Sequence, residues 1–133
     1  MIERREPLGP RHRILVADDD PAVRESLCRG LRRYFEVEEV GDGVDVVARV
    51  EAGKTFAAII MDLEMPLLDG RRTLERLAAI APELARRTLI LTGGTGSPAL
   101  QRWLGELPPG RVLWKPVSVA TLMAALNGLV GPR

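Results

Sequence analysis

Residues 14–21 read ILVADDDP, four apolar residues followed by three aspartates and a proline. A short apolar run of this kind is typical of a strand that is buried on both faces of a sheet. Asp20 and Pro21 are suited to open a helix, with the aspartate as its N-cap and the proline in its first turn. The stretch therefore predicts a buried strand that ends on acidic side chains, directly before a helix.

The same strand-then-helix pattern continues along the chain. Further apolar runs predict strands over 35–40, 57–61, 89–91 and 112–114, and the more polar run 35–40 is suited to the edge of a sheet. Each run is followed by residues at helical spacing, and the helix after the third strand is expected to stop at Pro82. Alternating strands and helices predict an α/β domain whose parallel sheet is covered on both faces. The helix positions expected to face the core are Val23, Leu27, Leu31 and Tyr34, then Val44, Val47 and Ala48, then Leu74, Leu77, Ala78 and Ala81.

Length and composition restrict the class of protein. The 133 residues fit one domain, and the formal net charge of +1 lacks the basic excess typical of proteins that bind nucleic acid or anionic membranes. No apolar run approaches the roughly 18 residues of a transmembrane helix. Cys28 is the only cysteine, which excludes an internal disulfide. We expect residues 1–12 to be a flexible tail or linker remnant, residues 13–131 to be the domain, and its location to be cytoplasmic.

Polar side chains stand where four of the predicted strands end. Asp18 and Asp19 follow the first strand, Asp62 ends the third, Thr92 follows the fourth and Lys115 follows the fifth. In open α/β sheets, ligands bind outside the carboxyl ends of the strands. If these strands are neighbours, three carboxylates, one hydroxyl and one ammonium group converge there. Clustered carboxylates favour a hard cation such as Mg²⁺, beside which a carboxylate can attack phosphorus to form an aspartyl phosphate.

Four stretches of this sequence, in this order, resemble the receiver domains of bacterial response regulators. They are ILVADDDPAVRESL (14–27), IIMDLEMPLLDG (59–70), LILTGG (89–94) and WKP (114–116). The resemblance covers residues 13–130 and implies a flavodoxin-like (βα)5 fold, a doubly wound parallel sheet of five strands in the order 2-1-3-4-5. It also implies a cis peptide bond between Lys115 and Pro116, a bond type that is almost confined to proline.

The resemblance implies a role for each polar residue of the predicted site. Asp62 would be the phosphoacceptor, Thr92 the hydroxyl that follows the phosphoryl group, and Lys115 the ammonium that pairs first with Asp62 and then with phosphate. The implied cofactor is Mg²⁺. Its ligands would be Asp18, Asp19, Asp62 and the backbone carbonyl of Glu64.

The resemblance also implies partners and a signalling output. The phosphoryl donor would be the phosphohistidine of a histidine kinase or of a histidine phosphotransfer domain. Phosphorylation would switch the surface made by the fourth predicted helix, the strand 112–114 and the last helix. The domain would phosphorylate and dephosphorylate itself, whereas any kinase activity would lie in other domains of a parent protein, such as the hybrid histidine kinases whose receivers the LTGG sequence resembles. No nucleic acid and no membrane segment are expected, and a phosphorylation-linked dimer stays open.

Two alternatives remain at this point. Val112 stands three residues before Lys115, where the family usually has an aromatic residue that turns inward on activation. This departure leaves open a receiver-fold interaction module that acts without phosphorylation. Trp114, two residues after Val112, is expected to point to the same face of the strand and offers an aromatic surface there.

The other alternative is a phosphohydrolase of the haloacid dehalogenase type, whose motif the Asp18-x-Asp20 pattern mimics. That motif has Thr or Val where Ala22 stands, and it requires a later acidic pair that this sequence lacks.

Overall fold

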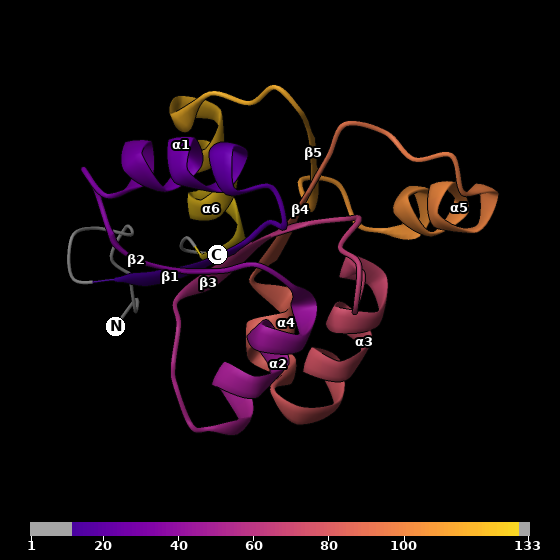
Figure 1. Ribbon diagram of the computed structural model, residues 1–133, viewed down its shortest axis with the longest axis horizontal. Helices are drawn as coiled ribbons and strands as arrows, with labels where there is room; N and C mark the ends of the chain where they lie inside the picture. Colours follow the sequence, from indigo (N-terminus) through magenta and orange to yellow (C-terminus); the bar gives the residue numbers. More distant parts are fainter. Residues whose placement is uncertain (1–11, 131–133) are drawn as a thin grey trace, which may run out of the picture.

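A parallel sheet of five strands in the order β2-β1-β3-β4-β5 crosses the middle of the molecule (Figure 1). The computed structural model describes residues 12–130. Its strands are β1 (Arg13–Ala17), β2 (Glu36–Val40), β3 (Ala58–Asp62), β4 (Thr88–Thr92) and β5 (Val112–Trp114). Its helices are α1 (Pro21–Leu31), α2 (Gly43–Glu51), α3 (Gly70–Ile80), α4 (Pro82–Arg86), α5 (Pro98–Glu106) and α6 (Val119–Val130). The predicted fold class and strand order are confirmed.

Helices cover both faces of this sheet, so the middle residues of its central strands are apolar. Helices α1 and α6 lie on one face, and α2, α3 and α4 lie on the other (Figure 1). Successive side chains of a strand point to opposite faces. Ile14 of β1 accordingly packs in the cluster on the α1 side, and Leu15 packs in the cluster on the α2 side. Both residues are fully buried, as a strand with two covered faces requires.

The register of the strands brings their carboxyl ends to one edge of the sheet. Ala17 of β1 aligns with Met61 of β3, and Thr92 of β4 aligns with Trp114 of β5. The residues that follow β1 and β5, together with the last residues of β3 and β4, therefore lie next to one another. This edge is where the sequence predicts the functional side chains.

The segment after α3 differs from the prediction. Helix α3 ends at Ile80, close to the expected stop, but Pro82 then opens α4, a short helix that the sequence pattern did not indicate. Proline is accepted at a first helical position because the N–H group it lacks would have no partner inside the helix. The predicted fourth helix is therefore α5, and the predicted last helix is α6.

Three helices bury only part of the face that was expected. Leu31, Val47 and Leu77 are buried as predicted, whereas Tyr34, Ala48 and Ala78 are exposed. In α1 the fully buried residues are Cys28 and Leu31, whereas Val23 is 38% exposed. In α2 the buried face includes Val46 and Val47. Val44, in the first turn of α2, is exposed instead. The expected face was chosen from spacing alone, which does not show at what angle a helix crosses the sheet.

Two expectations concern the ends of the chain. Residues 1–11 of the predicted tail lie outside the described residues, and so does the expected domain end at residue 131. Between residues 12 and 130, no helix has the length and apolar character needed to cross a bilayer.

Candidate functional site

The first part of the site is the turn between β1 and α1. Asp18 is buried, its backbone N–H donates a hydrogen bond to the Val40 carbonyl of β2, and its Oδ1 accepts one from the Asp20 N–H at 2.9 Å. The Asp20 carboxylate in turn accepts hydrogen bonds from the N–H groups of Ala22 and Val23. This confirms the prediction that Asp20 caps α1. The turn is thereby fixed with Asp18 and Asp19 at the edge of the sheet.

Lys115 connects the ends of β1 and β3. Its backbone N–H donates to the Thr92 carbonyl, which places the residue directly after β5, and its peptide bond to Pro116 is cis as predicted. The Lys115 Nζ atom lies 3.1 Å from Asp18 Oδ2 and 3.2 Å from Asp62 Oδ1. One ammonium group therefore pairs with two carboxylates that lie 44 residues apart in the sequence.

Three carboxylates gather at this edge of the sheet. Asp18, Asp19 and Asp62 each offer an oxygen atom, and these atoms lie within 4.8 Å of one another. Burial raises the pKa of Asp62, and nearby Asp18 raises it further, against the opposing attraction of Lys115. Burial disfavours the charged form of Lys115, but its contacts with Asp18 and Asp62 outweigh that effect and raise its pKa. The cluster keeps an excess of negative charge, which a bound cation would neutralise.

Thr92 and Glu64 lie beside this cluster. Thr92 is the buried last residue of β4, and its Oγ1 accepts a hydrogen bond from the Gly94 N–H at 3.0 Å. Glu64 is exposed in the loop after Asp62. The structure thus brings Asp18, Asp19, Asp62 and Lys115 together, with Thr92 at the end of the neighbouring strand.

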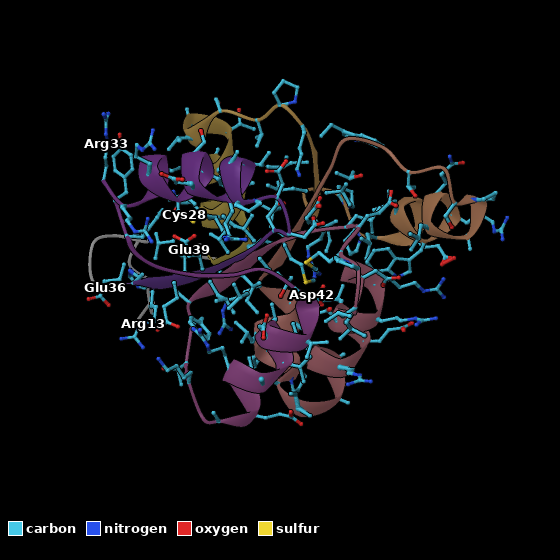
Figure 2. The ribbon with its side chains drawn as sticks, viewed as in Figure 1. Arg13, Cys28, Arg33, Glu36, Glu39 and Asp42 are labelled. Atoms are coloured by element: carbon cyan, nitrogen blue, oxygen red, sulfur yellow. The ribbon has the colours of Figure 1, made fainter. Side chains whose placement is uncertain are left out.

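The loop after β3 is held by an aspartate that does not belong to the predicted site. Asp42 is buried at the start of α2 (labelled in Figure 2), and its carboxylate accepts hydrogen bonds from the N–H groups of Val44, Leu67 and Leu68 at 3.0 to 3.1 Å. It therefore caps α2 and also ties down the loop that contains Glu64. An Asp-Gly pair is a local signal for a cap, but its contacts with residues 67 and 68 depend on the fold.

The surface beyond Thr92 is loosely packed. Helix α5 projects from the sheet (Figure 1), and none of its residues is fully buried. A hollow of about 470 Å³ lies between α5 and β5, and its lining includes Val112 and the 60% exposed Trp114. A second hollow, of about 610 Å³, lies beside Lys115 between α1 and the segment after β5.

Comparison with known proteins agrees with this geometry. The family model of the response regulator receiver domain matches residues 14–127. The response regulator MprA of Mycobacterium avium (strain 104) is 33% identical over 121 residues, which cover 89% of this chain and 50% of the relative. MprA of Mycobacterium sp. (strain KMS) is 34% identical over the same coverage. The chain therefore spans about half the length of the curated relatives it matches.

Solved structures of receiver domains are similar as well. A response regulator receiver domain protein from Clostridium thermocellum superposes with a TM-score of 0.76 and 25% identity, covering 90% of this chain and 94% of that one. The receiver domain of the sensor histidine kinase PA1611 from Pseudomonas aeruginosa PAO1 has a TM-score of 0.71 and 27% identity, covering 90% and 97%. The latter structure has a magnesium ion coordinated in its active site cleft.

Proposed function

This chain belongs to the response regulator receiver domain family of two-component systems, and we propose that it accepts a phosphoryl group on Asp62 in a phosphorelay. The observation that carries the proposal is the surroundings of this carboxylate. Asp62 ends β3 with Lys115 Nζ 3.2 Å from its Oδ1 and with oxygen atoms of Asp18 and Asp19 within 4.8 Å. A carboxylate that lies beside an ammonium group and an acidic pair is suited to nucleophilic attack on phosphorus next to a metal ion.

The carboxylate oxygens of the cluster fit Mg²⁺, which prefers hard oxygen ligands. Asp18, Asp19 and Asp62 would hold the ion together with the backbone carbonyl of Glu64. When bound, Mg²⁺ neutralises negative charge on the phosphoryl oxygens. The magnesium ion in the similar receiver domain of PA1611 supports this assignment.

In the proposed reaction, a carboxylate oxygen of Asp62 forms a bond to the phosphorus of a phosphohistidine or of a small acyl phosphate. The P–N or P–O bond to the donor breaks, and the imidazole or the carboxylate of the donor leaves with the electron pair. The Lys115 ammonium, already 3.2 Å from Asp62, moves its contact to a phosphoryl oxygen. Phosphoryl transfer depends on positioning and charge neutralisation more than on acid–base catalysis, which suits a site without histidine.

The proposed output is a change in the surface of α5, β5 and α6. The Thr92 hydroxyl would give up its contact with the Gly94 N–H and donate to the phosphoryl group, which pulls on the loop that leads into α5. Loose packing of α5 and the hollow beside it leave room for such a shift. Val112 replaces the usual aromatic residue, so the coupling would depend on Thr92 and on the exposed Trp114.

The proposed donor is a histidine kinase or a histidine phosphotransfer domain. The mainly apolar hollow beside Lys115 supports this, because it offers a partner a docking surface next to the reacting carboxylate. Attachment to a hybrid histidine kinase, a phosphorylation-linked dimer and a cytoplasmic location stay predictions.

The phosphohydrolase alternative loses support, because the second aspartate of its motif, Asp20, is engaged as the N-cap of α1.

The test is the intact mass of the protein after incubation with acetyl phosphate, in Mg²⁺ or in EDTA. We expect the wild type to gain one base-labile phosphoryl group only in Mg²⁺, and Asp62→Asn to gain none. Asp69→Asn is the matched control, since Asp69 lies in the same loop but accepts a hydrogen bond from the Arg72 N–H as the cap of α3. A phosphoryl gain that persists in Asp62→Asn would contradict the assignment. No gain from acetyl phosphate or from a phosphorylated kinase, and no beryllofluoride binding, would favour the interaction module.

A further inference from the structure

Arg24 of α1 contacts the backbone of the acidic pair from outside the cluster. Its Nη1 donates a hydrogen bond of 2.7 Å to the Asp18 carbonyl oxygen, and its Nε donates one of 3.0 Å to Glu39 Oε1. The side chain is only 21% exposed. One guanidinium therefore joins α1, the end of β1 and the edge strand β2.

The charge of Arg24 is already balanced by Glu39. Figure 2 shows Glu39 on the side of the sheet that α1 covers, and its second oxygen accepts a hydrogen bond of 2.9 Å from Arg32. The hydrogen bonds from Arg32 and Arg24 lower the pKa of Glu39, so this carboxylate is ionised at neutral pH. Because the positive charge of the guanidinium is already paired with Glu39, its main effect on Asp18 is to fix the orientation of the Asp18 carbonyl through a hydrogen bond.

The carbonyl that Arg24 holds belongs to the peptide group between Asp18 and Asp19. A peptide group is planar, so fixing its carbonyl oxygen also fixes the direction in which the chain reaches Asp19. The Asp18 carboxylate has anchors of its own in the Asp20 N–H and Lys115. Asp19 is exposed, so the position of its carboxylate depends on the conformation of its backbone.

We propose that Arg24 is a positioning residue of the metal site, which orients the Asp19 carboxylate by holding the peptide group between Asp18 and Asp19. The inference rests on the proposed function, because it concerns Mg²⁺ binding by the same acidic cluster. It also predicts whether removal of Arg24 weakens or tightens the binding of Mg²⁺. If Arg24 acted on the metal through its charge, its removal would tighten cation binding, since like charges repel. If it acts by positioning, its removal weakens binding.

The test compares Arg24→Met with Arg32→Met. Each substitution removes one positive charge and one hydrogen bond to Glu39, but only the first removes the hydrogen bond to Asp18. Titration with Mg²⁺, monitored by amide NMR, should show that the Mg²⁺ dissociation constant is about tenfold higher in Arg24→Met than in the wild type. This is the lower end of the effect expected when a residue that orients a metal ligand is removed. The constant should change less than about twofold in Arg32→Met. In metal-free protein, the amide signal of Asp19, which reports on the peptide group that Arg24 holds, should shift in Arg24→Met only.

Unchanged or tighter Mg²⁺ binding by Arg24→Met would overturn the inference, and so would equal weakening in Arg32→Met. If Arg24→Met does not fold, Arg24→Lys replaces it, because an ammonium group keeps the charge but cannot make both bonds of the guanidinium fork. Weaker binding is then expected in Arg24→Lys and not in Arg32→Lys, and equal binding in the two would overturn the inference. A wild type that binds no Mg²⁺ would overturn the proposed function itself, which distinguishes the two failures.

Discussion

Replacing Lys115 with methionine should destabilise the metal-free protein, because two carboxylates would then face each other without a cation. The ammonium lies 3.1 and 3.2 Å from Asp18 and Asp62, and each contact is worth about 5 kcal/mol of Coulomb energy at an effective dielectric constant of about 20. Most of this is offset by the cost of removing the charges from water. Because the Lys115 side chain is 26% exposed, we place the net loss in the free energy of unfolding at the low end of the range for a broken buried pair, about 3 kcal/mol.

The size of this effect depends on pH and on metal. The raised pKa of Lys115 means that its stabilisation is present at neutral pH and is lost only as the pH rises through that value. On the acid side the difference between the two proteins shrinks as the carboxylates take up protons. Mg²⁺ should also narrow the difference, since a bound divalent ion supplies the positive charge that the variant lacks.

Urea unfolding in EDTA at pH 7, followed by circular dichroism, measures the effect. Lys54→Met is the matched control, because Lys54 pairs with Glu38 at 3.1 Å but its side chain is 45% exposed, and the expected change there is below about 0.5 kcal/mol. The reasoning is refuted if Lys115→Met unfolds at the urea concentration of the wild type. It is also refuted if the two lysine variants lose equal stability.

Three further predictions concern packing and titration. Gly43→Ala should lower the free energy of unfolding by about 2 to 3 kcal/mol, because a Cβ there would overlap Thr73 Oγ1. Gly128→Ala, whose Cβ would have nothing within 4 Å, should be neutral or up to about 1 kcal/mol stabilising, and thermal unfolding compares the two variants. Burial raises the pKa of Asp62, so in metal-free protein the stability that its protonated form provides is lost as the pH rises from the ordinary pKa of an aspartate, about 4, through the raised pKa. Asp62→Asn should therefore gain melting temperature relative to the wild type as the pH rises above about 4, and a difference that does not change with pH would contradict this. Burial raises the pKa of the Cys28 thiol to about 11, so a disulfide reagent should modify it only on unfolding, and rapid labelling of the native protein would exclude that packing.

The sheet and the acidic cluster could be predicted from the sequence because each strand is marked by residues that are neighbours in the chain, and the same pattern recurs at every strand. Each buried strand is a short apolar run, and the polar residue that follows it lies at the same edge in every parallel strand. Asp18, Asp62 and Lys115 could therefore be grouped before their contacts were known. The cap role of Asp20 was equally local, since cap and first turn are neighbours in the chain.

The supports of the site could not be predicted in the same way. The carboxylate of Asp42 accepts hydrogen bonds from residues 25 and 26 positions away, and such pairs follow from the packing of loops. Arg24 had a weak local signal, because it lies one helical turn after Asp20 and so faces the end of β1. Its partner Glu39 comes from another strand. Helix α4 escaped prediction because the proline that ends a helical pattern also serves as the first residue of a helix.

Localising the phosphoryl group tests the central claim most directly. The protein would be incubated with acetyl phosphate and Mg²⁺ and then treated with borohydride, which reduces an acyl phosphate to an alcohol and so turns a phosphorylated aspartate into homoserine. Peptide mass spectrometry then identifies the residue that has become homoserine. The account predicts homoserine at position 62 alone, and none when EDTA replaces Mg²⁺. Homoserine at position 18 or 19, or labelling of position 62 that is as strong in EDTA, would contradict it.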